Sequence, residues 1–293
     1  MKQDVIIIGG GFAGMSAALP LLSARRNVLV IDAGLRRNRA ADHARGFLGQ
    51  DGINPNEIAD TSRKQVEAYP TLTWQDANVA RVSGEKDNFA VTTEDGERFD
   101  ARRVIFATGV SDTLPDIEGV SDRWGKSVFH CPYCHGYDLN QGEIGLIATG
   151  QISVHMAQIL PDWGKVTILI NNAFELDDET RSTLIGRGVS IELTPVARVK
   201  GYADIELVDG RELSFTGLFL ASRVAPASPV AQLLGCELEE TQMGVQTLTD
   251  DTKETTVAGA YACGDAAHIP HSITLSAADG AWAGVNVHRS LMI

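Results

Sequence analysis

The chain has 293 residues, of which 44% are hydrophobic and 22% are charged, a composition that excludes disorder as its main state. Lys and Arg total 25 against 38 Asp and Glu, which gives a formal net charge of −13. This charge excludes a protein that neutralises many nucleic-acid phosphates, and it makes an anionic membrane surface a poor partner. The chain also lacks an apolar run of the ~20 residues that cross a membrane, and it begins without a signal peptide, so we expect a cytoplasmic location.

Residues 4–32 have the pattern of a dinucleotide-binding βαβ unit. An apolar run that predicts a buried strand leads into Gly9, Gly11 and Gly14, and a helix of small apolar residues follows. A second predicted strand, 27–32, ends in Asp32. Glycines at this spacing allow a tight turn, a close approach of the backbone to a pyrophosphate and close helix packing. The acid can accept hydrogen bonds from a ribose, and the helix N-terminus favours the phosphates.

Two further patterns indicate that this first domain is completed by later parts of the chain. An apolar strand runs into Ala107-Thr108-Gly109, and within residues 255–267 a short strand runs into Gly264-Asp265. An acid at such a strand end can bind the ribityl hydroxyls of a flavin. The terminal segment 276–291 predicts a helix of small residues that packs closely on the same domain.

A second βαβ pattern at 142–170 predicts a second domain of the same kind. Its glycine pattern is degenerate, because Ala148, Gly150 and Ser153 stand at the three glycine positions. We therefore expect an α/β protein with two Rossmann-like domains. The first, residues 1–114 and 244–293, is predicted to be split by the second, residues 115–243, where the acidic excess of the chain is concentrated.

Four cysteines are too few for a disulfide framework in a chain of this length. Cys131 and Cys134 are spaced C-x-x-C, which in a cytosolic protein indicates redox chemistry or metal binding. A structural zinc site needs about four ligands, and the run Cys131 to His135 offers three, so we expect no metal. We expect His135 to act as an acid or base, because an imidazole titrates near neutral pH.

The order of these motifs, ending in Tyr-Ala-Cys-Gly-Asp at 261–265, resembles the low-molecular-weight thioredoxin reductases over essentially the whole chain. The resemblance implies FAD in the split domain, NADPH in the inserted domain, a homodimer and a redox disulfide over the flavin. It also implies that Cys134 lies next to the flavin and that Cys131 exchanges with the substrate. Residues 36–52 and 131–138 resemble a narrower branch, the dithiol oxidases that close disulfides in small natural products of the gliotoxin and holomycin type. Reductases usually carry an acid where this chain has His135.

The resemblance also implies a set of cofactor-binding residues. His271 and Ser272 fall where the reductases carry Arg-Gln beside the flavin. The full expected set is Gly9, Gly11, Phe12, Ala13, Gly14, Asp32, Asn38, Val79, Ala107, Thr108, Gly109, Gly264, Asp265, His271, Ser272 and Ile273.

The inserted domain departs from the reductase pattern at the expected NADPH site. After its second strand, reductases place basic residues that hold the 2′-phosphate, but residues 171–179 contain no Lys or Arg and four carboxylates. We therefore expect an FAD-dependent dithiol oxidase that does not use NADPH and passes electrons to O2 or another acceptor. The alternatives are a thioredoxin-disulfide reductase driven by NAD(P)H or by another donor such as ferredoxin, and a non-catalytic flavoprotein.

Overall fold

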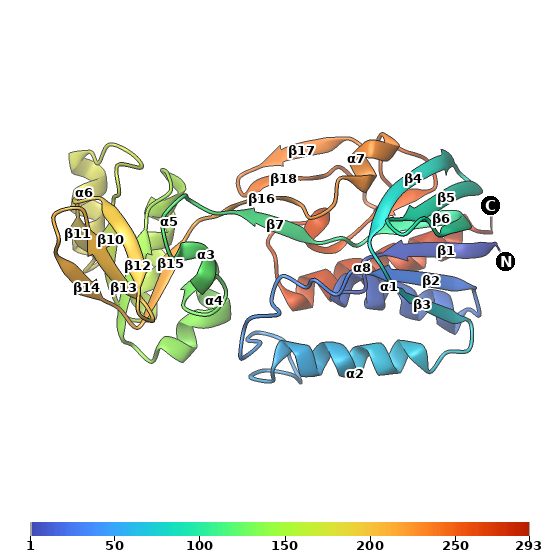
Figure 1. The fold of residues 1–293 in the computed structure, drawn as a ribbon, viewed down its shortest axis with the longest axis horizontal. Helices are drawn as coiled ribbons and strands as arrows, with labels where there is room; N and C mark the ends of the chain where they lie inside the picture. The colour runs from blue at the N-terminus through green and yellow to red at the C-terminus, as the bar shows by residue number, and fades with distance from the viewer. Residues whose placement is uncertain (1, 293) are drawn as a thin grey trace. The chain divides into compact units, whose positions relative to one another are not determined.

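The computed structural model describes residues 2–292, which form two compact units. The first comprises the chain up to Arg39, Pro55–Asp112 and the chain from Val224 onward, so both ends of the chain lie in it (Figure 1). The second comprises Ala40–Asn54 and Thr113–Arg223.

The first unit is built on a seven-stranded sheet in the order β3-β2-β1-β6-β5-β4, with β19 also paired to β6. Strands β3, β2, β1, β6 and β19 are parallel to one another. The antiparallel hairpin of β4 and β5 continues the sheet, with β5 antiparallel to β6. The register places Ile7 of β1 between Val30 and Ile105, all three of them fully buried. The strands are β1 (Gln3–Ile8), β2 (Val28–Asp32), β3 (Leu72–Asp76), β4 (Val79–Glu85), β5 (Asn88–Thr93), β6 (Arg98–Phe106) and β19 (Ala260–Ala262).

Close packing of α1 (Phe12–Ser23) against α8 (Ile273–Ser290) joins the two ends of the chain within this unit. A Cβ added to Gly280 would lie 2.1 Å from the carbonyl oxygen of Ala13, and one added to Gly284 would lie 2.2 Å from that of Ala17. Only glycine therefore allows this helix spacing. The other helical segments of the unit are α2 (Pro55–Glu67), α7 (Val230–Leu234) and the 3₁₀ turn η3 (Gly264–Ala266).

A four-stranded sheet has the order β17-β18-β16-β7. Its strands are β7 (Val110–Thr113), β16 (Arg223–Pro226), β17 (Leu238–Thr241) and β18 (Gly244–Thr247). The chain passes from one unit to the other within two of these strands, β7 and β16. Because β16 and β17 both pair with β18, residues 224–243 belong to the first compact unit. The sequence predicts that the first domain begins again at Gly244, whereas the first compact unit begins again at Val224. It also predicts residues 40–54 in the first domain, and they lie in the second compact unit.

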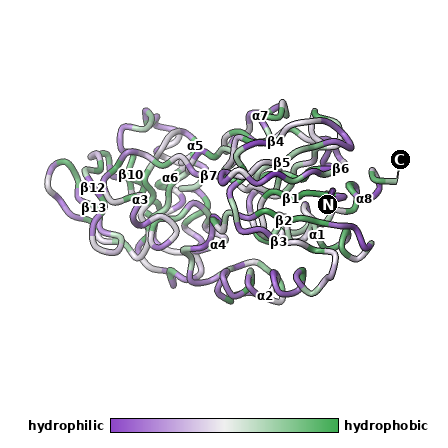
Figure 2. The backbone as a smooth tube through the Cα atoms, turned by 45° about the vertical axis from the view of Figure 1, so that its right-hand side comes forward, coloured by the Kyte–Doolittle hydropathy of each residue, from purple (hydrophilic) through white to green (hydrophobic). Residues whose placement is uncertain are grey.

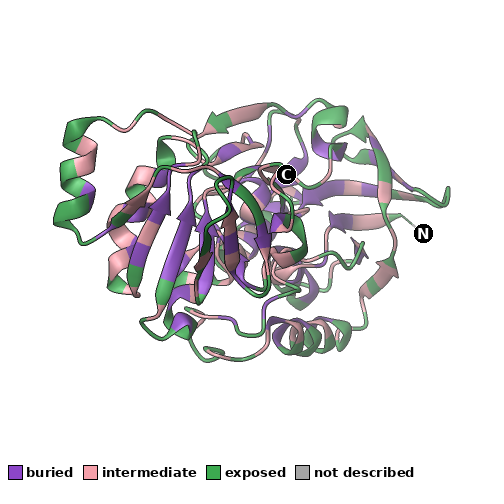
Figure 3. Cartoon of the chain, turned by 60° about the vertical axis from the view of Figure 1, so that its left-hand side comes forward, coloured by how far each residue is buried: buried purple, intermediate pink, exposed green. Residues whose placement is uncertain are grey.

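The second unit contains a five-stranded parallel sheet in the order β11-β10-β9-β15-β8 and a three-stranded antiparallel sheet, β12-β13-β14. In Figure 3, which colours the chain by burial, many residues of the strands are buried and the helices carry exposed residues. The strands are β8 (Val128–Phe129), β9 (Glu143–Ile147), β10 (Lys165–Leu169), β11 (Ser190–Glu192), β12 (Val196–Lys200), β13 (Asp204–Leu207), β14 (Glu212–Ser214) and β15 (Gly217–Leu220). The helical segments are α3 (Val120–Arg123), α4 (Pro132–His135), η1 (Gly136–Leu139), α5 (Ile152–Ile159), η2 (Leu160–Asp162) and α6 (Asp178–Gly186).

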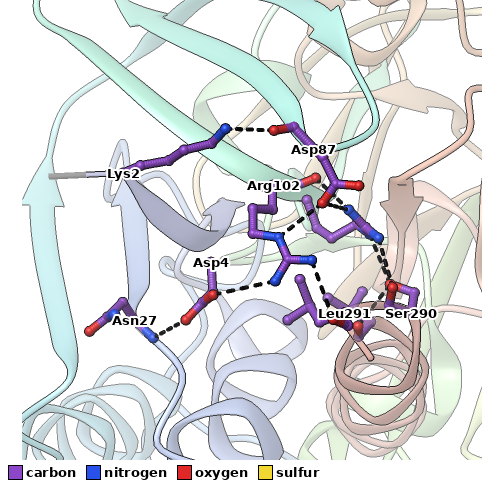
Figure 4. Close-up of polar contacts among 9 residues, drawn as sticks. Lys2, Asp4, Asn27, Asp87, Arg102, Ser290 and Leu291 are labelled. Atoms are coloured by element: carbon purple, nitrogen blue, oxygen red, sulfur yellow. Dashed lines mark hydrogen bonds and ion pairs between the residues drawn. The ribbon is translucent and has the colours of Figure 1, made fainter. Parts of the chain in front are cut away.

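A polar network ties β6 of the first unit to the end of α8 (Figure 4). The fully buried guanidinium of Arg103 donates to the carboxylate of Asp87 at 2.9 Å and to the hydroxyl and carbonyl oxygens of Ser290 at 2.9 and 2.7 Å. Arg102 donates to the same carboxylate and to the carbonyl oxygen of Leu291. The buried charge is thus paired and hydrogen-bonded, as a buried guanidinium must be.

Hydropathy along the backbone follows this layered architecture. Strands β1 and β2 are hydrophobic, whereas α2 is largely hydrophilic and covers the outside of its unit (Figure 2). Within residues 2–292 we find no helix that is both long and apolar enough to span a membrane.

Candidate active site

The first glycine loop has the geometry that its sequence predicts. Gly9 has a φ of +102°, and a Cβ there would lie 2.3 Å from the carbonyl oxygen of Ala107. A Cβ on Gly14 would lie 1.9 Å from the carbonyl oxygen of Gly9. The backbone N–H of Gly10 donates to Asp32 Oδ1 at 2.9 Å, which fixes the acid at the end of β2. These contacts explain why the loop needs glycine at both positions.

The N-terminus of α1 is open toward a ligand. Gly11 is its N-cap, no side chain caps the helix, and a Cβ built on Gly11 meets no described atom within 4 Å apart from those of its chain neighbours and its own helix. Phe12, Ala13 and Gly14 form the first turn. Free N–H groups, a positive dipole end and space for close approach are what a pyrophosphate requires, so these residues fit the phosphates of FAD.

Five other predicted cofactor residues lie at the edge of the sheet where β1, β6 and β19 have their carboxyl ends. Ala107, Thr108 and Gly109 follow β6, and Gly264 and Asp265 follow β19. Because β6 pairs with both β1 and β19, the loops after all three strands meet at this edge, where open α/β sheets bind ligands. A Cβ on Gly264 would lie 2.6 Å from that of Ala13.

Five further predicted residues have defined places in the first unit. Val79 begins β4, and the nearby N–H of Ala77 donates to the carbonyl oxygen of Asp32 at 3.0 Å. Asn38 lies in the loop after β2. Ser272 is the N-cap of α8 and its hydroxyl accepts from the N–H of Leu275 at 3.1 Å, with Ile273 beginning the helix and His271 preceding the cap.

Sequence reasoning missed a buried ion pair that supports the Gly264-Asp265 turn. Lys253 Nζ lies 3.1 Å from Asp279 Oδ1 and donates to the carbonyl oxygen of Ala267 at 3.2 Å. The other carboxylate oxygen of Asp279 accepts from the N–H of Gly264 at 2.9 Å. The pair therefore holds both ends of the turn that presents Asp265. The sequence gives no sign of it, because Lys253 stands in an ordinary polar run.

Cys131 and Cys134 form a disulfide in the second unit, with their Cα atoms 5.3 Å apart. Cys131 is the N-cap of the short helix α4, and Cys134 lies within it. The other two cysteines are buried free thiols, and burial raises the pKa of both Cys236 and Cys263. High thiol pKa values make these two unreactive, so disulfide chemistry is confined to the Cys131–Cys134 pair.

His135 ends α4 and stacks on Phe129, with ring centroids 4.1 Å apart and planes inclined by 15°. Burial lowers the pKa of the His135 imidazole to about 4, against the opposing influence of the Asp138 carboxylate. The expectation that this imidazole titrates near neutral pH is therefore wrong, because a charged ring is penalised in this apolar setting. At neutral pH His135 is therefore uncharged.

A cavity of about 450 Å³ lies beside the redox helix within the second unit. Tyr133, which stands between the two cysteines and is 70% exposed, lines it together with Arg45, Gly46, Asp51 and Tyr137. The guanidinium of Arg45 donates to the Asp138 carboxylate at 2.5 Å and lies 5.0 Å from the centre of the Tyr137 ring. These contacts explain why residues 40–54 belong to the unit of the disulfide.

The second glycine loop differs from the first in a way that its sequence only partly predicts. Ser153 is fully buried and occupies the position that Gly14 has in the first unit. Because a Cβ on Gly14 would collide with the carbonyl oxygen of Gly9, the second loop cannot adopt the same tight turn. The Ser153 hydroxyl accepts the N–H of Thr149 at 3.0 Å. Ala148 is buried and donates its N–H to the carbonyl oxygen of Leu169, as Gly9 of the first loop donates to Ile31. The two loops therefore differ in the residue at the third glycine position and not in the number of bound N–H groups.

The acidic run after β10 lies at the start of α6. Asp177 is its N-cap and accepts from the N–H of Thr180 at 2.6 Å, and this hydrogen bond lowers the pKa of Asp177. Asp178 and Glu179 lie in the first turn. Their charges stabilise the helix N-terminus, and they oppose a phosphate at the same place.

Comparisons with known proteins agree with this arrangement. The model of the pyridine nucleotide-disulphide oxidoreductase family matches residues 3–280. The chain is 31% identical to the protein named thioredoxin reductase sirT from Leptosphaeria maculans, over 97% of this chain and 93% of that protein. An oxidoreductase structure from Agrobacterium tumefaciens matches with a TM-score of 0.97 and 47% identity, covering 100% of this chain and 99% of that one. The structure of HlmI matches with a TM-score of 0.91 and 33% identity, covering 99% and 93%.

These matches confirm the predicted fold class of two Rossmann-like domains, one split by the other. FAD is the cofactor of the thioredoxin reductase-like proteins, and the open α1 terminus and glycine loop of the first unit fit it. The chain belongs to the pyridine nucleotide-disulphide oxidoreductase family and is a thioredoxin reductase-like FAD disulfide oxidoreductase.

Proposed function

We propose that the protein is a dithiol oxidase that closes a disulfide in its substrate and does not use NADPH. One observation carries the proposal: the segment after β10, where a reductase holds the 2′-phosphate of NADPH, is acidic and contains no Lys or Arg. Asp177, Asp178 and Glu179 lie at the start of α6, and residues 171–179 supply no cation to a phosphate. The enzyme therefore has an FAD site and a redox disulfide, and takes its electrons from a dithiol.

The proposed reaction begins at the Cys131–Cys134 disulfide. One substrate thiolate attacks Cys131 Sγ, the disulfide breaks, and Cys134 leaves as a thiolate. The second substrate thiolate then attacks the substrate sulfur of the mixed disulfide and releases Cys131. The substrate has lost two electrons and two protons, and the cysteine pair has gained the electrons. When bound, FAD supplies two-electron redox chemistry through which the pair is reoxidised at the expense of O2 or another acceptor.

We assign to His135 the role of hydrogen-bond acceptor for the substrate thiol. Its imidazole is uncharged at neutral pH because burial lowers its pKa to about 4, so a ring nitrogen is free to accept a hydrogen bond but the ring does not hold the proton. The substrate proton therefore passes to solvent.

The expected partner is a small dithiol that enters the cavity beside Tyr133. This cavity of about 450 Å³ is open to solvent, and the exposed aromatic rings of Tyr133 and Tyr137 offer apolar faces to a small substrate. Several relatives, such as sirT, carry the name thioredoxin reductase, so reduction of a thioredoxin disulfide by NAD(P)H or ferredoxin is the competing function. A homodimer and a cytoplasmic location stay predictions.

Steady-state turnover with dithiothreitol as a model dithiol tests the proposal. We expect consumption of O2, or of an added electron acceptor, together with cyclic disulfide product, and loss of turnover in Cys131→Ser and in Cys134→Ser. A Cys236→Ser variant is the matched control, because its thiol is buried and has a raised pKa. Absence of dithiol oxidation, together with thioredoxin reduction driven by ferredoxin or NADPH, would support the competing function.

A further inference from the structure

Arg37, Asp112 and His271 form a polar cluster in the first unit, and no step of the proposed reaction uses it. Arg37 Nε donates to Asp112 Oδ2 at 2.8 Å, and its Nη2 makes a second, parallel contact with the same carboxylate. The remaining terminal nitrogen, Nη1, lies 3.0 Å from His271 Nδ1. His271 is only 8% exposed. The cluster therefore joins the loop after β2, the strand β7 and the segment that precedes α8.

The contact with Arg37 fixes the protonation of the imidazole. A guanidinium has only donors, so Nδ1 of His271 must be the acceptor in this hydrogen bond. An uncharged imidazole with Nδ1 as acceptor carries its proton on Nε2. A second proton on Nδ1 would face the guanidinium, which Asp112 holds in place by two contacts.

The charged groups around His271 favour this uncharged form on balance. Burial and the positive charge of Arg37 lower the pKa of the imidazole, and His268 acts in the same direction. The carboxylates of Asp265 and Asp112 act against them, and the net direction is downward. Asp265 is the residue expected to bind the ribityl chain, so the ring lies close to the predicted flavin site.

The proton on Nε2 has no acceptor within the protein. Nε2 is buried, and no residue between 2 and 292 forms a hydrogen bond with it. A buried N–H without an acceptor destabilises a protein, so such a group calls for a partner outside the polypeptide. The next two residues, Ser272 and Ile273, are themselves predicted to contact FAD.

We propose that His271 is a cofactor-binding residue that donates its Nε2–H to an acceptor atom of FAD, and that Arg37 is the positioning residue that holds it in the donor form. Asp112 in turn orients Arg37. The inference concerns only the FAD site. Its tests therefore do not depend on whether the protein oxidises dithiols or reduces thioredoxin.

Nitrogen-15 NMR of the FAD-loaded protein with labelled histidine tests the first part without a variant. We expect His271, assigned by its absence in His271→Gln, to show an unprotonated Nδ1 and a protonated Nε2 at pH 7. The Nε2–H signal is expected to shift when FAD is removed. A charged ring, or a proton on Nδ1, would overturn the proposal, and so would a signal that does not respond to FAD.

Variants test the second part through the dissociation constant of FAD, followed by flavin fluorescence. Loss of one uncharged hydrogen bond weakens binding by about 2- to 10-fold, which we expect for His271→Phe. His271→Gln retains a donor near the Nε2 position and is expected to retain most of the affinity. Arg37→Met is expected to weaken FAD binding by a factor in the same range of about 2- to 10-fold, because the proton of the uncharged imidazole can then move from Nε2 to Nδ1. Exposed Arg39, two residues away, provides the control Arg39→Met.

Equal FAD affinity in His271→Phe and the wild type would show that the donor binds water and would refute the assignment. If His271→Phe does not fold, the NMR measurement on the unmodified protein and the FAD affinity of Arg37→Met decide the question. An FAD affinity of Arg37→Met equal to that of Arg39→Met would contradict the positioning role.

Discussion

Breaking the Lys253–Asp279 pair is expected to destabilise the first unit strongly. The two side chains are 9% and 12% exposed, their charged atoms lie 3.1 Å apart, and each holds one end of the Gly264-Asp265 turn. Lys253→Met leaves a largely buried carboxylate without its cation. Removal of one partner of a buried pair costs about 3–5 kcal/mol, and the residual exposure places our expectation at about 3 kcal/mol.

The double variant Lys253→Met/Asp279→Asn separates the ion pair from the rest of the site. Asparagine keeps an oxygen that can accept from the Gly264 N–H, and it removes the unpaired charge. We therefore expect the double variant to be about 2 kcal/mol more stable than the sum of the two single losses predicts. Urea unfolding of the four proteins at one fixed FAD concentration measures this coupling. Losses that add to within about 0.5 kcal/mol would refute the reasoning.

Three further predictions concern His135, Arg103 and the second glycine loop. The folded pKa of His135, about 4, lies below its unfolded value of 6.5, so the unfolded chain binds a proton first as pH falls. Wild-type stability should therefore drop between pH 6.5 and 4 more steeply than that of His135→Phe; equal slopes in urea unfolding would contradict this. Arg103→Met should lose about 1–3 kcal/mol of unfolding free energy in the same assay, whereas the exposed control Arg98→Met should change by less than about 0.5 kcal/mol. Ala148→Gly/Ser153→Gly restores the glycine pattern without supplying a cation, so NADPH should still fail to reduce the flavin in an absorbance assay, and reduction would contradict the expectation.

The sequence predicts the parts of the fold that depend on neighbouring residues. The strand, glycine loop, helix and acid that end at Asp32 follow one another within 29 residues, and each is visible as a pattern. Residues 142–170 repeat the pattern, so both nucleotide-type units and the split of the first are predictable. The Cys131–Cys134 pair is equally local.

Other features depend on contacts between distant residues, which the sequence does not reveal. Residues 40–54 belong to the second unit through Arg45, whose partner Asp138 lies 93 residues away. The pKa of His135 depends on burial beside Phe129, so its residue type alone predicts the wrong value. Ser153 is visible as a departure from glycine, but only the structure shows that it occupies the Thr149 N–H.

Anaerobic reduction of the FAD-loaded, oxidised enzyme tests the central claim most directly. Flavin absorbance is followed in a stopped-flow instrument after mixing with dithiothreitol, NADPH or NADH in separate experiments. We expect rapid bleaching with the dithiol, which is lost in Cys134→Ser, and no bleaching with NADPH on the same time scale. Rapid bleaching by NADPH, with little response to the dithiol, would contradict the account.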